Sequence, residues 1–254
     1  MRKTCCSKAI RNNPAIFHLS VADILLIETS TIVCSAGLLS NGEVIALHES
    51  NDKNSHAGQI TVFIDEVMKK CGKTFSQLDA VSVSMGPGSY TGLRIGVSTA
   101  KGICYALDKP LIAVNTLQAM AAGFVNKYGG SLNGNDLLCP LIDARRMEVY
   151  QALFNREFQT VQETEAVVID SDSFKDVLQK QRLWFFGDGA EKCKSVLGTH
   201  HNALFVDDFV PSAAFLAPMT NVAWQISQFE NTAYFEPFYL KDFVAALPKV
   251  KGLR

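Results

Sequence analysis

Several common sequence features are missing from this 254-residue chain. No apolar run reaches the roughly 20 residues that a membrane-spanning helix needs. The seven cysteines include no Cys-x-x-Cys pair, and their odd number does not suit a disulfide framework, so a reducing, cytoplasmic compartment is expected. The formal net charge of −1 excludes a strong overall attraction to nucleic acid or membranes. Any nucleic-acid partner is therefore expected to be held mainly by another subunit or by a local patch.

Signatures of metal and nucleophile chemistry are missing as well. None of the five histidines pair at i, i+3 or i, i+4, the spacings that place two imidazole ligands on one helix face. A metal site would have to be assembled from distant residues, and we predict none. The sequence also lacks the Gly-x-Ser-x-Gly turn that presents a nucleophilic serine.

The most distinctive stretch is Gly-Pro-Gly-Ser-Tyr-Thr-Gly-Leu-Arg-Ile-Gly at residues 86–96, between a strand-like and a helix-like run. Glycine and proline favour a turn there, and Ser89 can cap the helix. Small residues recur at every fourth position and form what we call the small-residue ridge: Gly88, Gly92, Gly96, Ala100 and Cys104. Because glycine inside a helix costs about 1 kcal/mol against alanine, the ridge predicts close packing against a second backbone, which can belong to another chain.

A phosphate-binding loop is the alternative for the same stretch, since a strand, a glycine-rich turn and a helix N-terminus together favour anions. A nucleoside-triphosphate loop needs a lysine, and no lysine precedes Lys101 in the motif. The dinucleotide fingerprint fails because Thr91 stands where the third glycine belongs. Packing is therefore the favoured interpretation.

Hydrophobic patterning predicts an α/β fold with two related lobes. In the first half, Asn41-Gly42 joins two strand-like runs, and an apolar stripe at helical spacing marks a helix that Ser55 can cap. That stripe is Ile60, Phe63, Ile64, Val67, Met68 and Cys71. The predicted strands are 24–27, 33–39, 43–49, 79–85, 111–114, 137–142, 148–154, 167–169 and 183–186, and the predicted helices are 55–72, 89–107, 116–125, 172–180 and 212–228.

We predict a lobe boundary near residues 108–110, which gives an N-terminal lobe at 23–109 and a C-terminal lobe at 110–254. Residues 1–22 differ in composition, because four basic residues precede the first acid at Asp23. They are interpreted as a disordered extension or as a start site placed too far upstream. A targeting peptide is the alternative.

Two groups of polar residues follow strand-like runs and could approach a nucleotide. Glu28, Thr29 and Ser30 follow the first strand, where actin-like ATPases place an acid and hydroxyls beside metal-bound water and phosphate. The second group is Asp143 and Arg145, together with Gly187 and Gly189. Hydroxyl-rich and glycine-rich segments are also ordinary turns. The Asp143–Glu148 cluster is interpreted as a solvated hairpin turn with a local ion pair, and the alternative is that Arg145 or Arg146 grips a phosphate or a carboxylate. Each signal is weak by itself, so this is a candidate vestigial nucleotide site.

Four segments together resemble the TsaB family, also called YeaZ. They are Ile-Glu-Thr-Ser (27–30), the long glycine motif (86–97), Ile-Asp-Ala-Arg (142–145) with Glu-Val-Tyr (148–150), and Glu-Pro-Phe-Tyr-Leu-Lys (236–241). The resemblance implies an actin-like, sugar-kinase-like (ASKHA) fold of two related α/β lobes. One departure is Glu28, which replaces the aspartate usual at the end of the first strand.

The resemblance also implies a function: a non-catalytic scaffold subunit in the synthesis of threonylcarbamoyladenosine in tRNA. The expected partners are a TsaD-like catalytic subunit that the chain activates, a TsaE-like ATPase, a second copy of the chain when alone, and tRNA indirectly, with no membrane. No intrinsic cofactor is expected, and ATP acts at the level of the complex. The first two helices are expected to form the interface, through Ile60, Phe63, Ile64, Val67, Gly88, Gly92, Leu93, Gly96 and Ala100. The alternative is an independent actin-like ATPase or glycoprotease-type hydrolase.

Overall fold

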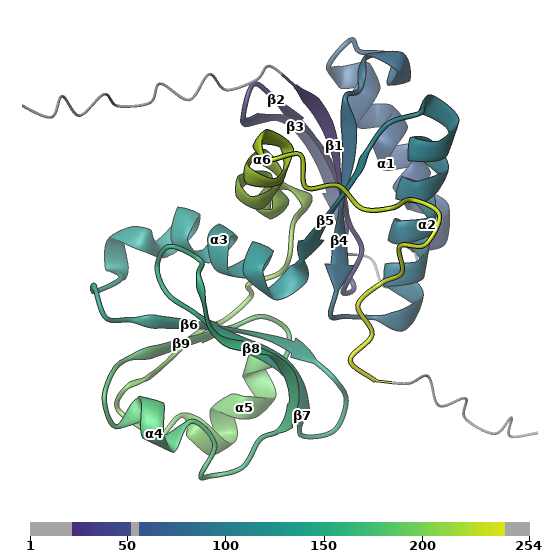
Figure 1. The fold of residues 1–254 in the computed structure, drawn as a ribbon. Helices are drawn as coiled ribbons and strands as arrows, with labels where there is room; N and C mark the ends of the chain where they lie inside the picture. Colours follow the sequence, from purple (N-terminus) through teal and green to yellow (C-terminus); the bar gives the residue numbers. More distant parts are fainter. Residues whose placement is uncertain (1–21, 52–55, 242–254) are drawn as a thin grey trace, which may run out of the picture.

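A five-stranded mixed sheet forms the first lobe, with the strand order β3-β2-β1-β4-β5. A computed structural model of the chain describes residues 22–51 and 56–241 (Figure 1). Three antiparallel strands are followed by two that run parallel to β1. The strands are β1 (Asp23–Glu28), β2 (Cys34–Ser40), β3 (Glu43–Ser50), β4 (Ala80–Gly86) and β5 (Leu111–Asn115).

Helices cover both faces of this sheet, which is why β1 is apolar at consecutive positions. Leu25 and Ile27 pack with α1 (His56–Lys70) and α2 (Tyr90–Leu107) on one face. Ile24 and Leu26 face the opposite side, against η3 (Ala213–Leu216) and α6 (Ala217–Gln225). Figure 1 shows α1 and α2 as a two-helix layer on the outer side of the lobe. Their remaining faces are therefore the outer surface of this lobe.

The second lobe has its own five-stranded sheet in the order β10-β9-β6-β7-β8. β6, β7 and β8 are antiparallel, and β9 and β10 continue parallel to β6. Its strands are β6 (Leu137–Asp143), β7 (Glu148–Phe154), β8 (Thr160–Val168), β9 (Leu183–Phe186) and β10 (Ala203–Val206). The helix α5 (Ala190–Leu197), with the short α4 (Lys175–Leu178), packs on one face. The helix α3 (Thr116–Tyr128) covers the other face.

The two sheets repeat one plan. Reading from the antiparallel side, β3-β2-β1-β4-β5 corresponds to β8-β7-β6-β9-β10 in order and direction. β1 and β6 are the central strands of their sheets. α2 follows β4 and packs on β1, and α5 follows β9 and packs on β6. The prediction of two related α/β lobes is confirmed by this topology.

The predicted boundary at residues 109/110 is wrong, because β5 pairs with β4 and belongs to the first sheet. The chain enters the second lobe only after β5 and returns to the first with η3 and α6. Residues 22–51, 56–115 and 213–235 therefore build the first lobe together. Ala22, one residue before the predicted start of this lobe, is only 5% exposed and packs in its core. The predictions for residues 1–21 and for the Ser55 cap lie outside the described residues.

Most predicted elements are present, and four elements of the second half differ from the prediction. β8 starts seven residues before the predicted strand at 167–169, and the polar residues at successive positions in its first part conceal this edge strand. α5 and β10 were not predicted, and the predicted helix at 172–180 is only a four-residue turn of helix. No helix in the described ranges is long and apolar enough to span a membrane. The five cysteines described are all free thiols.

Candidate functional site

The small-residue ridge packs inside the first lobe, against the turn that follows β1. Thr29 Oγ1 donates a hydrogen bond to the Gly92 carbonyl at 2.8 Å, and Ser89 N donates to the Ser30 carbonyl at 2.6 Å. A Cβ atom at Gly88 would overlap the Ser30 carbonyl, and one at Gly96 would overlap Thr29 Oγ1. The predicted second backbone exists, but it is residues 29–30 of the same chain. The prediction that these glycines meet a partner helix is wrong.

The other predicted interface residues are core residues of the monomer. Helical spacing correctly predicted that they share a face, but that face meets the sheet. Their exposed fractions are 7% or less: Ile60, Phe63, Ile64, Val67, Leu93 and Ala100. A partner can therefore touch α1 and α2 only on their opposite faces.

Those opposite faces carry a second, unpredicted set of small and apolar residues. Gly102 lies in the middle of α2 and is exposed to solvent, and a Cβ atom added there would have no neighbour within 4 Å. Tyr105, one turn further, is 87% exposed, and Val62 on the adjacent α1 is 49% exposed. Ser98 is also exposed on α2. We call Val62, Ser98, Gly102 and Tyr105 the outer α1–α2 face.

Glu28 is completely buried at the end of β1. One carboxyl oxygen, Oε1, accepts a hydrogen bond from Ser30 N at 2.6 Å, while Oε2 and Ser30 Oγ lack a partner among the described atoms. Burial raises the pKa of Glu28 above its usual value, and the nearby Ser30 and Ser84 hydroxyls only partly oppose this. The glycine turn lies so close to Ser30 that even a methyl group at Gly88 would not fit. A nucleotide phosphate therefore has no direct access to this acid in this conformation.

The second predicted group does come together, at the ends of β6 and β9. Asp143 Oδ1 accepts a hydrogen bond from Arg145 N at 2.8 Å, and the same carboxylate pairs with Lys192. Asp143 N donates to Asp188 Oδ1 at 2.9 Å. Gly187 and Gly189 form the tight turn above Leu141, where side chains would clash with β6. These residues form a single cluster in the second lobe.

Opposite pKa shifts distinguish the two acids of this cluster. Burial by itself would raise the pKa of Asp143, but the hydrogen bond from Lys192 and the Arg145 contacts lower it below its usual value. Burial raises the pKa of Asp188, and the hydrogen bond from Asp143 N only partly offsets this. The Asp143 side chain is about half exposed, so its carboxylate is in contact with solvent.

Glu28 and Asp143 occupy equivalent places in the two lobes. Each ends a central strand and accepts the amide hydrogen of the residue two positions later. The equivalent glycine turns precede α2 in one lobe and α5 in the other. Among the described residues, no hydrogen bond or ion pair joins the two sets. The candidate nucleotide site stays a prediction, with a covered group of residues at the end of β1 and an open group at the end of β6.

The turn between β6 and β7 holds two adjacent arginines in the left-handed region. The φ values are 74° at Arg145 and 51° at Arg146, and no other two adjacent non-glycine residues in the described ranges have positive φ. Such a conformation costs roughly 1–3 kcal/mol per residue. Both side chains are exposed, and neither guanidinium makes a hydrogen bond or ion pair with a described residue. The bare sequence gave no sign of this strain.

The segment 235–241 connects the two lobes at these strand ends. Phe238 N donates to the Met85 carbonyl at 2.8 Å in the first lobe, and Lys241 pairs with Glu148 in the second. Tyr239 accepts a hydrogen bond from Arg94 on α2 at 3.3 Å. Phe238 and Lys241 are only three positions apart, so this segment links the end of β4 directly to the start of β7. The sequence motif gave no indication of this bridging role.

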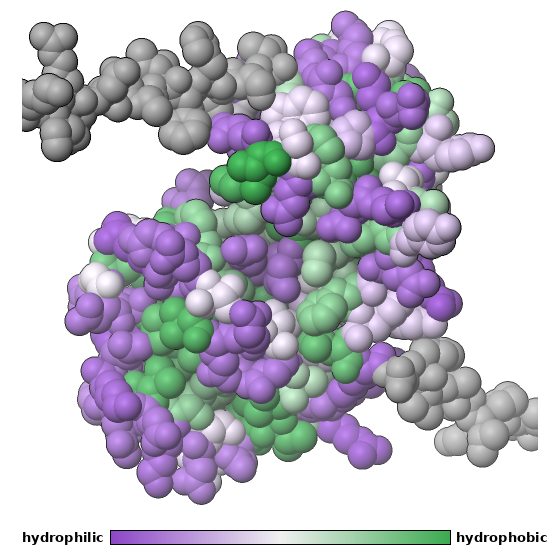
Figure 2. All heavy atoms as spheres, viewed as in Figure 1, coloured by the Kyte–Doolittle hydropathy of each residue, from purple (hydrophilic) through white to green (hydrophobic). Residues whose placement is uncertain are grey.

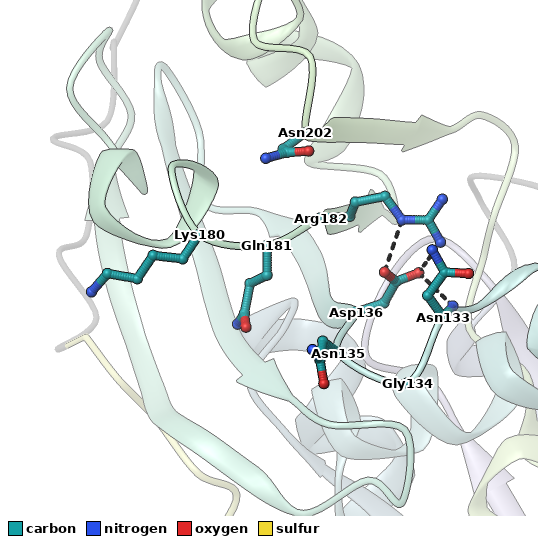
Figure 3. A pocket seen from close by; sticks show the side chains of 8 residues that line it. All are labelled: Asn133, Gly134, Asn135, Asp136, Lys180, Gln181, Arg182 and Asn202. Atoms are coloured by element: carbon teal, nitrogen blue, oxygen red, sulfur yellow. Dashed lines mark hydrogen bonds and ion pairs between the residues drawn. The ribbon is translucent and has the colours of Figure 1, made fainter.

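Two hollows lie on the second lobe, and neither is lined by a predicted site residue. The first, of about 370 Å³, is bordered mainly by amide side chains (Figure 3). At its edge Asp136 accepts hydrogen bonds from Arg182 Nε and Trp184 Nε1, both at 2.8 Å. These bonds fasten the loop before β6 to β9. The second hollow, of about 520 Å³, lies between β8 and the residues around α4.

An exposed apolar patch on α6 and the placement of the metal-binding side chains also bear on function. A compact group of hydrophobic side chains lies over α6 in Figure 2, where Val222 and Ile226 are 58% and 65% exposed. Within residues 22–51 and 56–241, no three His, Cys, Asp or Glu side chains are grouped so that they could hold a metal ion.

Sequence comparisons find known proteins that are similar to this chain over most of its length. The model of the family described as TsaD, tRNA N6-adenosine threonylcarbamoyltransferase, matches residues 43–251. The tRNA threonylcarbamoyladenosine biosynthesis protein TsaB of Escherichia coli is 30% identical over 227 residues, covering 87% of this chain and 96% of that protein. The TsaB protein of Bacillus subtilis is 36% identical over 131 residues, 52% of this chain and 54% of that protein.

A solved structure gives the same result for the fold. YeaZ from Pseudomonas aeruginosa superposes with a TM-score of 0.74 at 23% identity, over 86% of this chain and all of that chain. The chain therefore has the fold of YeaZ, with two mixed five-stranded sheets of the same strand order. The chain therefore belongs to the wider family that the TsaD model describes and, within it, to the TsaB (YeaZ) family of tRNA threonylcarbamoyladenosine biosynthesis proteins.

Proposed function

We propose that this chain is a non-catalytic scaffold subunit that binds and activates a TsaD-like catalytic subunit in tRNA threonylcarbamoyladenosine formation. The observation that carries the non-catalytic role is the burial of Glu28 under the glycine turn. This is the position where an actin-like ATPase presents an acid to metal-bound water. A carboxyl group that is fully buried, and whose pKa is raised by that burial, is poorly suited to that task.

The outer α1–α2 face is the proposed docking surface for the TsaD-like subunit or, when the chain is alone, for a second copy. Gly102 has no intramolecular reason to lack a side chain, although glycine costs about 1 kcal/mol in a helix interior. Close approach of a partner helix supplies that reason. The exposed Val62 and Tyr105 lie on the same two-helix layer and offer apolar contact area. In this proposal the complex works in the cytoplasm, ATP and a TsaE-like ATPase act on the assembled complex, and the chain holds no cofactor itself.

Gly102→Leu is expected to weaken association at least tenfold, because about 1.4 kcal/mol is one decade and overpacking costs about 1–3 kcal/mol per site. The monomer should be at least as stable as wild type, since leucine is the better helix former. Sedimentation velocity measures self-association, and co-purification with the TsaD-like subunit measures partner binding.

The matched control is Glu191→Leu, which places the same side chain on the exposed surface of α5 in the second lobe. It should leave both kinds of association unchanged. If Gly102→Leu retains wild-type self-association and partner binding, then the outer α1–α2 face is not the interface.

An independent hydrolase is the second candidate, and the open Asp143 cluster is the observation that favours it. An ionised, half-exposed carboxylate beside Lys192 has the chemistry to touch a polar ligand. Turnover assays of ATP and peptide substrates with the isolated chain test this candidate. Robust turnover that is lost in Asp143→Asn would support the hydrolase and contradict the scaffold role.

A further inference from the structure

The turn between β6 and β7 has properties that the scaffold role does not use. Arg145 and Arg146 are held next to each other in a backbone conformation that glycine and asparagine adopt more readily. The turn is closed by hydrogen bonds from Glu148 N to the Arg145 carbonyl and from Ala144 N to the Glu148 carbonyl, both 3.1 Å. The fold thus retains two large, charged side chains where small ones would cost less.

The neighbouring acids form ion pairs with lysines and not with these arginines. Asp143 is paired with Lys192, and Glu148 is paired with Lys241. Arg145 lies near enough to Asp143 to help lower its pKa, but its guanidinium makes no ion pair in the described chain. Both arginine side chains are exposed, and neither is held in an ion pair with a described residue. Figure 2 shows hydrophilic side chains gathered beside the place where the described chain ends at Lys241.

We infer that this turn, which we call the arginine turn, contacts the phosphate backbone of tRNA. A small anion would need a concave site, whereas a protruding pair of guanidinium groups suits an extended anionic polymer. Phosphate contacts position an RNA without reading its sequence. The inference rests on the proposed function, because it places the tRNA of the assembled complex against this subunit.

The bridging segment makes the arginine turn suitable for such positioning. Lys241 joins Glu148, the residue that closes the turn, and Phe238 is anchored on β4. The turn is thereby held in place relative to the lobe that carries the outer α1–α2 face. The nearly neutral chain needs a local patch of this kind, since its net charge of −1 provides no overall attraction for RNA.

The test is the double variant Arg145→Asn, Arg146→Gly, studied with the TsaD-like partner and with the chain alone. The probe is an unmodified tRNA transcript, and the readout is fluorescence anisotropy over a range of salt concentrations. Loss of two phosphate contacts should lower the affinity of the complex at least tenfold and reduce the slope of log K against log[salt] by about 2. The melting temperature should rise by a few degrees, because positive φ is no longer imposed on arginine.

The arginine variant is expected to be more stable than wild type but to bind tRNA more weakly. If the arginines had only a structural role, the tRNA affinity would not fall while the stability rises. The matched control is Lys175→Gln, Lys180→Gln, which removes two exposed charges elsewhere in the second lobe and should change the slope little. Unchanged affinity and slope in the arginine variant would overturn the inference. If the variant instead loses the TsaD-like partner, the turn contacts protein and the inference is wrong. If the wild-type chain never binds the partner, the proposed function fails, while the RNA comparison on the chain alone still decides the arginine turn.

Discussion

Gly96→Leu is expected to destabilise the folded monomer rather than only to separate subunits. The new side chain would overlap Thr29 Oγ1, in the turn that α2 packs against. Thr29 also donates a hydrogen bond to the Gly92 carbonyl, so moving it away disrupts that contact as well. Overpacking a well-filled core costs about 1–3 kcal/mol, and occasionally more. At about 3 kcal/mol, the melting temperature of a chain of this size should fall by roughly 6–12 °C.

Gly102→Leu is the matched control, because it makes the same change six residues away on the opposite side of α2. It should leave the melting temperature unchanged or slightly higher. Differential scanning calorimetry and soluble yield measure the two variants side by side. A Gly96→Leu protein that melts like wild type but no longer associates would show that the ridge meets another chain after all.

The second large effect is expected from Glu28→Gln, which should stabilise the protein at pH 8 and have little effect near pH 4. The folded-state pKa of Glu28 is raised above its unfolded value of about 4.5, so the fold favours the protonated carboxyl. Below the unfolded pKa both states hold the proton, and the stabilisation is fully present. As the pH rises towards the folded pKa, the unfolded chain releases its proton while the folded chain keeps it, and stability is lost.

Glutamine keeps the size and neutrality of the protonated acid, so the variant should not show this loss. Each unit of pKa shift corresponds to about 1.4 kcal/mol, and about 1 kcal/mol changes the melting temperature by roughly 2–4 °C. Melting curves from pH 4 to pH 8 measure the difference between variant and wild type. Glu163→Gln, at an exposed position of β8, is the control and should track wild type throughout. A Glu28→Gln protein that is less stable at pH 8 than wild type would show that Glu28 functions as a buried anion.

The sequence predicted the elements whose signals are local. The strands β1, β4 and β9 are short apolar runs, and the hairpin between β2 and β3 has an Asn-Gly turn, so each was placed within one or two residues. β8 was largely missed because an edge strand with one exposed face carries Gln, Glu and Thr at successive positions. β10 has four half-buried residues, too few for a periodicity to be seen.

The candidate site was predictable only in part, for a different physical reason. Spacing shows which side chains share a helix face, but it does not show what covers that face. Gly96 was therefore correctly expected to pack closely, and its neighbour was wrongly assigned to another molecule. Gly102 could have been noticed as a helix glycine outside the four-residue repeat. The positive φ values of Arg145 and Arg146 have no sequence signal, since arginine is uncommon in that conformation.

The return of the chain to its first lobe has a consequence for protein synthesis. Ile24 and Leu26 are among the first core residues to leave the ribosome, but the helix that covers them, α6, follows almost 200 residues later. At elongation rates of about 5–20 residues per second, that face of the sheet stays uncovered for roughly ten to forty seconds. The second lobe, which is continuous in sequence, can complete its core before the first. The second lobe is therefore expected to fold before the first, and the nascent chain is expected to depend on chaperones until α6 emerges.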